Sequence, residues 1–67
     1  MDNRRYVCWW NTDIYDTPET RIVLNGFFTD DNGYTDTDVE TVEELNLGET
    51  YPIFDMGGLA HTITRVR

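Results

Sequence analysis

The residues best suited to covalent chemistry in this chain are its single cysteine, Cys8, and its single histidine, His61. A cysteine acts as a nucleophile when a neighbouring imidazole takes its proton and a third group orients that imidazole. Both residues fall in segments that we expect to be strands, and the sequence supplies neither an orienting group nor an oxyanion hole. We therefore interpret Cys8 as a small buried hydrophobe and His61 as a surface or rim residue. We expect no catalytic residues, no cofactor and no enzymatic activity.

Carboxylates are the other reactive groups, and they concentrate in the stretch TDDNGYTDTDVETVEELNLG, residues 29–48. This stretch has seven acidic side chains and no basic one: Asp30, Asp31, Asp36, Asp38, Glu40, Glu43 and Glu44. A calcium-binding EF-hand loop with Gly33 at its sixth position needs acidic ligands at its first and twelfth positions. Phe28 and Val39 stand there instead. Cys/His spacing for zinc is also missing. The stretch predicts a polar turn and no metal, with a looser cation site of Asp30, Asp31 and Asp36 as the alternative.

The charge balance excludes several classes of partner. The chain of 67 residues carries 13 acidic residues against 5 arginines and has no lysine, for a net charge of −8. Such a chain repels the phosphates of nucleic acids and the surface of anionic membranes. We expect neither as a direct partner. Adaptation to high salt is an alternative origin of the acidity, since surface carboxylates also keep a protein soluble.

The length allows one domain, residues 1–67, with little surface to bury. The sequence shows neither a secretory leader nor a run of about 20 apolar residues that would span a membrane. A lone cysteine forms no disulfide within the chain. We therefore expect a cytoplasmic protein with a reduced Cys8, inside a host cell if a phage encodes it.

Four segments rich in β-branched and aromatic residues predict strands, at residues 5–10, 20–29, 50–55 and 60–67. Gly26 indicates a bulge within the second strand, and Pro52 restricts the third to an edge or to its own first residues. Asp31-Asn32-Gly33 indicates a turn. With one helix after the second strand, the order β-β-α-β-β favours an α+β fold with an antiparallel sheet. A small curled SH3-like barrel with the helix plugging one end is the alternative.

The helix is expected at residues 38–46. Thr37 and Glu40 match a capping box at its start, and Gly48 is suited to end it in the left-handed conformation. Val39, Val42 and Leu45 recur every three residues and form an apolar stripe.

On this helix Glu40, Glu43 and Glu44 lie opposite the apolar stripe, and no Lys or Arg follows four residues later to neutralise them. Asp30, Asp31, Asp36 and Asp38 add charge before and at the start of the helix. One interpretation is a solvated helix face, and the other is a face that binds a basic surface of another protein. We favour the second, in which the protein inhibits or modulates a nucleic-acid-handling protein by occupying its basic groove. Some small inhibitors encoded by phages and mobile elements act in this way, which is an analogy of class only.

The pair Trp9-Trp10 is the most informative apolar feature, because adjacent strand residues point to opposite faces of a sheet. One tryptophan therefore lies away from the helix. If that tryptophan, Trp9 or Trp10, is exposed together with Tyr6 and Phe27, the three aromatic residues form an interface for a homodimer or a larger assembly. A covered second core is the alternative.

Overall fold

The strands and the helix form in the order expected from the sequence. The computed structural model describes residues 3–11, 20–55 and 57–67. Its strands are β1 (Arg5–Trp10), β2 (Thr20–Leu24), β3 (Thr50–Asp55) and β4 (Gly58–Arg65). Between β2 and β3 lie two short 3₁₀-helices, η1 (Asn25–Phe27) and η2 (Asp30–Asn32), and the α-helix α1 (Asp36–Glu43). The α+β fold with an antiparallel sheet and one short helix is thus confirmed.

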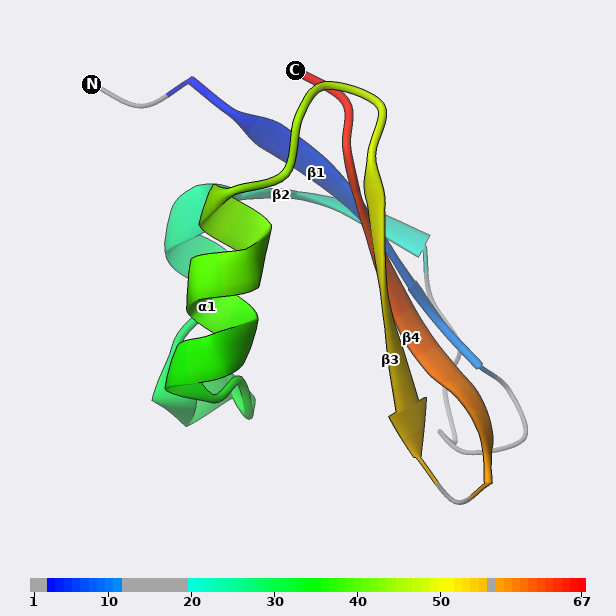
Figure 1. Ribbon diagram of the computed structural model, residues 1–67. Helices are drawn as coiled ribbons and strands as arrows, with labels where there is room; N and C mark the ends of the chain where they lie inside the picture. Colours follow the sequence, from blue (N-terminus) through cyan, green and yellow to red (C-terminus); the bar gives the residue numbers. More distant parts are fainter. Residues whose placement is uncertain (1–2, 12–19, 56) are drawn as a thin grey trace.

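The sheet is open, with strand order β2-β1-β4-β3 and antiparallel pairing throughout. The two outer segments of the chain, β1 and β4, pair in the centre, and α1 lies across one face of the twisted sheet (Figure 1). The alternative of a curled barrel is wrong, because β2 and β3 form opposite edges and do not pair with each other. The helix covers a face and plugs no end.

The strand limits follow the sequence closely at β1 and β3 and less closely at β2. Pro52 lies in an edge strand, as expected for a residue without an amide hydrogen. The second strand stops at Leu24, five residues before the expected end, because Asn25 begins η1. Gly26 belongs to η1 and makes no bulge in β2, so that prediction is wrong. An irregularity in strand pairing falls instead between Ile53 and Phe54.

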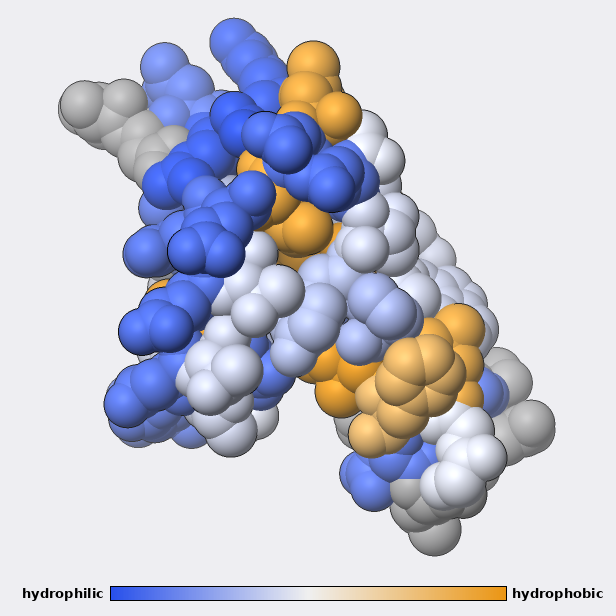
Figure 2. Space-filling model, viewed as in Figure 1, coloured by the Kyte–Doolittle hydropathy of each residue, from blue (hydrophilic) through white to orange (hydrophobic). Residues whose placement is uncertain are grey.

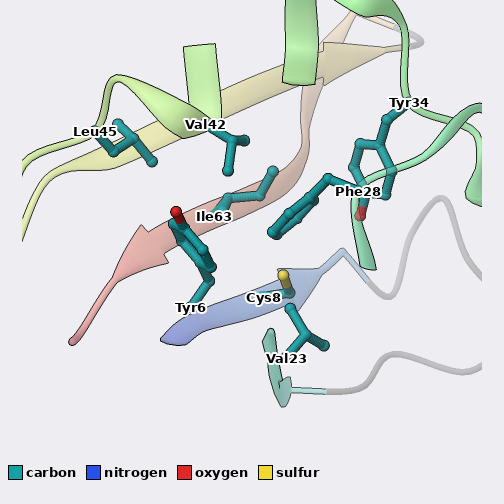
Figure 3. Packing of buried hydrophobic residues seen from close by; sticks show 8 residues of the cluster. All are labelled: Tyr6, Cys8, Val23, Phe28, Tyr34, Val42, Leu45 and Ile63. Carbon is teal, nitrogen blue, oxygen red and sulfur yellow. The ribbon is translucent and has the colours of Figure 1, made fainter. Parts of the chain in front are cut away.

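The core lies between α1 and the sheet face that it covers. Along β1 the side chains alternate: Tyr6 and Cys8 are fully buried beneath the helix, whereas Val7 and Trp9 belong to the opposite face. Figure 3 shows how side chains from the sheet, from α1 and from the segments next to α1 meet in this cluster. Its members are Tyr6, Cys8, Val23, Phe28, Tyr34, Val42, Leu45 and Ile63.

Aromatic rings hold the middle of the core together. Phe28 meets Tyr6 edge to face at 5.2 Å between ring centroids, and it meets Tyr34 in the same way at 5.1 Å. Phe28 and Tyr34 come from the irregular segment between β2 and α1, so these contacts fasten that segment to the sheet. Such pairs contribute about 0.5–1.5 kcal/mol beyond the burial of their area.

The hydroxyl of Tyr6 is buried without a hydrogen-bond partner among the described residues. An unsatisfied buried hydroxyl costs roughly 1–3 kcal/mol. We therefore expect Tyr6→Phe to raise the free energy of unfolding by about 1 kcal/mol. Tyr34→Phe is the matched control, since it removes a hydroxyl that is hydrogen-bonded to His61 at 2.9 Å, and it should lower stability. Urea unfolding of both variants measures this, and equal losses would contradict the expectation.

The helix begins earlier than the sequence indicated. Thr35 is the N-cap: its Oγ1 accepts from the Asp38 amide at 3.2 Å, and Asp38 Oδ2 accepts from the Thr35 amide at 3.0 Å. The prediction of a capping box at Thr37 and Glu40 is therefore wrong, although the motif type is right. The earlier start places Asp36 in the first turn, at the positive end of the helix dipole. It also directs Asp38 towards the sheet.

Two arginines from the chain ends meet the end of the helix. Arg4 donates to the Glu43 carbonyl at 3.1 Å, and Arg65 donates to the Leu45 carbonyl at 3.0 Å. Cations suit these positions because the last carbonyls carry the negative end of the dipole. The helix ends at Glu43, three residues before the predicted end. Gly48 has the expected left-handed backbone, with φ 87°, but it forms the turn into β3 and does not end the helix.

Candidate functional site

The acidic side chains gather on the outer side of α1 and on η2. Hydrophilic residues cover the side of the molecule that α1 forms (Figure 2). At 100° per residue, Asp36, Glu40, Glu43 and Glu44 share one arc of the helix, opposite buried Val42. We define the acidic face as the six exposed acids of η2, of α1 and of the C-cap of α1: Asp30, Asp31, Asp36, Glu40, Glu43 and Glu44. All six are exposed, as expected from the sequence.

Asp38 does not belong to this face, which corrects one predicted site residue. It lies on the side of α1 that faces the sheet, where its Oδ1 accepts from the hydroxyl of Tyr51 at 2.7 Å. Burial alone would raise the pKa of Asp38, but hydrogen bonds from the Thr35 amide and the Tyr51 hydroxyl outweigh it and lower the pKa. Asp38 is therefore ionised at neutral pH and half-buried.

Among the residues that the structure describes, the carboxylates of the acidic face bind no counter-charge. Within residues 3–11, 20–55 and 57–67, none of its six acids forms an ion pair. Arg4 and Arg65 approach the C-terminal end of α1, where they bind the backbone carbonyls of Glu43 and Leu45. Their positive charge offsets part of the negative field at that end. Asp30, Asp31 and Asp36, at the other end, have no described arginine bound to them.

The four aromatic residues considered for one interface lie in different places. Tyr6 is in the core and contributes nothing to a surface. Trp10 and Phe27 are half-buried on the face that α1 covers, where their rings meet edge to face with 6.4 Å between the ring centroids. Only Trp9, 36 % exposed, lies on the opposite face. The prediction of a single aromatic patch is wrong because the side chains along β1 alternate between faces.

The open face of the sheet nevertheless exposes apolar side chains. The strand register places Val7 beside Ile22, and Arg5 beside Leu24. Ile22 is 70 % and Leu24 is 51 % exposed, on the same face as Trp9. The sequence does carry a signal for this surface, since Ile22, Val23 and Leu24 are consecutive and a strand can cover only alternate residues.

A cavity opens between the start of α1 and the far part of the β3–β4 hairpin, where Figure 2 shows the surface hollowed. Its volume is about 280 Å³. The lining residues come from five parts of the chain: Trp10, Asn32, Gly33, Tyr34, Asp38, Ile53 and His61. No pattern in the sequence indicates this cavity, because its residues are brought together by strand pairing and by the η2 turn.

His61 is the centre of a buried hydrogen-bond network, so its interpretation as a surface or rim residue is wrong. It is 3 % exposed and stacks on Trp10 at 4.6 Å between centroids. Its Nδ1 lies 2.7 Å from the Trp9 carbonyl, which only accepts, so Nδ1 carries the hydrogen. In the neutral ring, Nε2 then accepts from the Tyr34 hydroxyl. Burial lowers the pKa of His61, opposed by its hydrogen bond to Trp9 and by the charge of Asp38.

This network predicts a dependence of stability on pH. The unfolded chain takes up a proton on His61 near pH 6.5, whereas the folded chain resists it. The stabilisation that neutral, buried His61 contributes is therefore complete above about pH 6.5. It is lost as the pH falls below that value, at up to about 1.4 kcal/mol per pH unit. Urea unfolding from neutral to mildly acidic pH measures the slope. His61→Phe is the control, and a slope that persists unchanged in this variant would assign the effect to other groups.

Cys8 is a poor nucleophile in this setting. It is fully buried, and burial raises the pKa of its thiol to about 12, with the positive charge of Arg21 offsetting only part. The thiol is thus protonated at neutral pH. Both ring nitrogens of His61 are bonded elsewhere, to Trp9 and Tyr34. This geometry gives the pair Cys8 and His61 no role as a nucleophile and its base.

Among the residues that the structure describes, no group of three or more His, Cys, Asp or Glu side chains is arranged to hold a metal ion. In the same residues, no helix has the length and the apolar character needed to cross a membrane. A comparison with protein-family models found no match, and comparisons with curated proteins and with solved structures found none either.

Proposed function

We propose that the protein is a non-enzymatic binding module whose acidic face engages a basic surface of another protein. The observation that carries this proposal is the set of six exposed acids on η2 and α1 without a carboxylate ion pair among the described residues. Like charges on one helix face, and glutamates near a helix C-terminus, both destabilise a helix. Because this arrangement of charges lowers the stability of the helix, a role in binding explains it more readily.

The spacing of the acids supports a nucleic-acid-handling protein as the partner. Along α1 and its C-cap, the acidic face runs from Asp36 to Glu44, a rise of about 12 Å at about 1.5 Å per residue. Four carboxylates over that length give one charge per roughly 4 Å, close to the about 3.4 Å per phosphate along one DNA strand. A groove lined with Arg and Lys for a phosphate backbone would accept such a row of charges. The protein would then act as an inhibitor or modulator by nucleic-acid mimicry.

Capture of partners from a cell lysate tests this proposal. The immobilised protein should retain a basic protein at low salt and release it at high salt, because exposed charges are screened. Added duplex DNA should also release that partner, since the DNA and the acidic face compete for the same groove of the partner. Retention that neither salt nor DNA reduces would contradict the proposal.

A second candidate function is supported by the exposed apolar residues of the open sheet face. Trp9, Ile22 and Leu24 lie together on one face, and contiguous apolar surface is typical of subunit interfaces. In this alternative the chain is an assembly subunit that forms a homodimer or docks into a complex. Sedimentation distinguishes the acidic binding module from the assembly subunit. Dimerisation that Ile22→Thr abolishes favours the assembly subunit, whereas a protein that stays monomeric at all concentrations contradicts the homodimer.

A further inference from the structure

The cavity beside the acidic face combines a carboxylate with an aromatic ring. Asp38 contributes the carboxylate and Trp10 the indole, and Ile53 adds an apolar wall. Within the chain each oxygen of Asp38 accepts one hydrogen bond, from Tyr51 and from Thr35. A carboxylate has about four lone-pair sites, so Asp38 retains the capacity to accept from a ligand.

The indole of Trp10 is held in place by its neighbours. His61 stacks on it and Phe27 contacts it edge to face. His61 is itself fixed by hydrogen bonds at both nitrogens. Because burial keeps this imidazole neutral, it adds no positive charge to the wall. The wall therefore presents one negative charge and the preorganised indole of Trp10, and tryptophan has the best π-system for binding a cation.

Size and position restrict the occupant. A volume of about 280 Å³ is at the lower end for ligand pockets, which usually measure about 300–1,000 Å³. It suits a single side chain better than a nucleotide-sized cofactor. Asn32 and Gly33 line the cavity and directly follow Asp30 and Asp31 of the acidic face. A basic surface placed on that face can thus insert one side chain into the cavity.

We propose that the cavity binds one arginine side chain of the basic partner, with its guanidinium group against Trp10 and Asp38. This inference rests on the proposed function and names the residue type that the partner must supply. Arginine fits better than lysine because its planar group stacks on aromatic rings, pairs with carboxylates through two hydrogen bonds and is more weakly hydrated. The chain already contains one such contact, with the guanidinium of Arg21 5.4 Å from the centroid of Phe27.

Two peptides of equal charge test the inference. The first is a short oligolysine, and the second replaces its central lysine by arginine. In a Trp9→Phe background Trp10 is the only tryptophan, so its fluorescence reports on the cavity. We expect the arginine peptide to bind about tenfold more tightly and to change the emission of Trp10, as a cation–π contact in a partly buried site allows.

Variants of two aspartates separate the cavity from the acidic face. Asp38→Asn and Asp36→Asn each remove one negative charge from α1, so both weaken both peptides. Only Asp38→Asn should abolish the preference for arginine. Asparagine keeps one acceptor oxygen, so it preserves one of the two bonds that the Thr35 amide and the Tyr51 hydroxyl donate to separate oxygens, and circular dichroism verifies that it folds. Trp10→Leu should abolish it as well, with circular dichroism to verify that this variant folds.

The outcomes distinguish the inference from the function on which it rests. Equal, salt-sensitive affinity for the two peptides, with unchanged Trp10 emission, overturns the cavity assignment and leaves the acidic face intact. Absence of binding by either peptide at low salt overturns both. A preference for arginine that persists in Asp38→Asn overturns the assignment of the carboxylate.

Discussion

Ile63→Ala is expected to unfold most of the protein at 37 °C, whereas Ile22→Ala should leave it folded. Ile63 is fully buried on β4 beneath α1, and removing a buried isoleucine side chain to alanine costs about 2–5 kcal/mol. A chain of 67 residues has a total stability of roughly 3–10 kcal/mol at about 0.05–0.15 kcal/mol per residue. The stability lost in Ile63→Ala is therefore comparable to the total stability of the protein. Thermal unfolding followed by circular dichroism measures it.

Ile22→Ala is the matched control, because it makes the same change in a side chain that is 70 % exposed on the open face. We expect an effect of no more than about 0.5 kcal/mol. A large loss of stability from Ile22→Ala would show that the open face is buried in solution. Such a loss would favour the assembly subunit over the acidic binding module.

The second large effect concerns binding. Replacing Glu40, Glu43 and Glu44 together by glutamine should weaken the affinity for the basic partner about tenfold to a hundredfold. Each exposed charge pair contributes at most about 1 kcal/mol, and three are removed. The same variant should be as stable as the wild type or more stable, since the repulsion along α1 and the unfavourable charges at its C-terminal end are relieved.

Opposite changes in affinity and stability identify a binding face, because a loss of fold would lower both. Calorimetric titration with the captured partner and urea unfolding provide the two measurements. The control is Ile22→Thr, which alters the open sheet face and should leave the affinity unchanged. An affinity that is unaffected in the glutamine variant, or reduced only in Ile22→Thr, would assign binding to the other face.

Local patterns predicted much of the fold. The run from Arg5 to Trp10 is rich in β-branched and aromatic residues and has no Gly or Pro, and the structure places β1 at those limits. Pro52 lies on an edge as its missing amide hydrogen requires. The apolar stripe of α1 is also confirmed, with Val42 and Leu45 buried. These features depend on neighbours in the sequence, which is why the sequence reveals them.

The errors arise where distant residues decide the outcome. Thr35 and Thr37 both precede an acid by three residues, and the choice of Thr35 as the cap depends on Tyr51 from β3 binding Asp38. His61 is buried because Trp10 and Tyr34 close over it from other segments. The cavity follows from the same contacts. Sheet order is likewise a long-range property, since β1 pairs with the last strand of the chain.

The dependence of affinity on salt is the most direct measurement of the central claim that the acidic face binds a basic surface. The Debye length falls from about 10 Å at 0.1 M salt to about 3 Å at 1 M. Titration of the captured partner across this range should show an affinity that falls at least about tenfold for the wild type, and less for the glutamine variant. An affinity that stays constant across the range would contradict the claim.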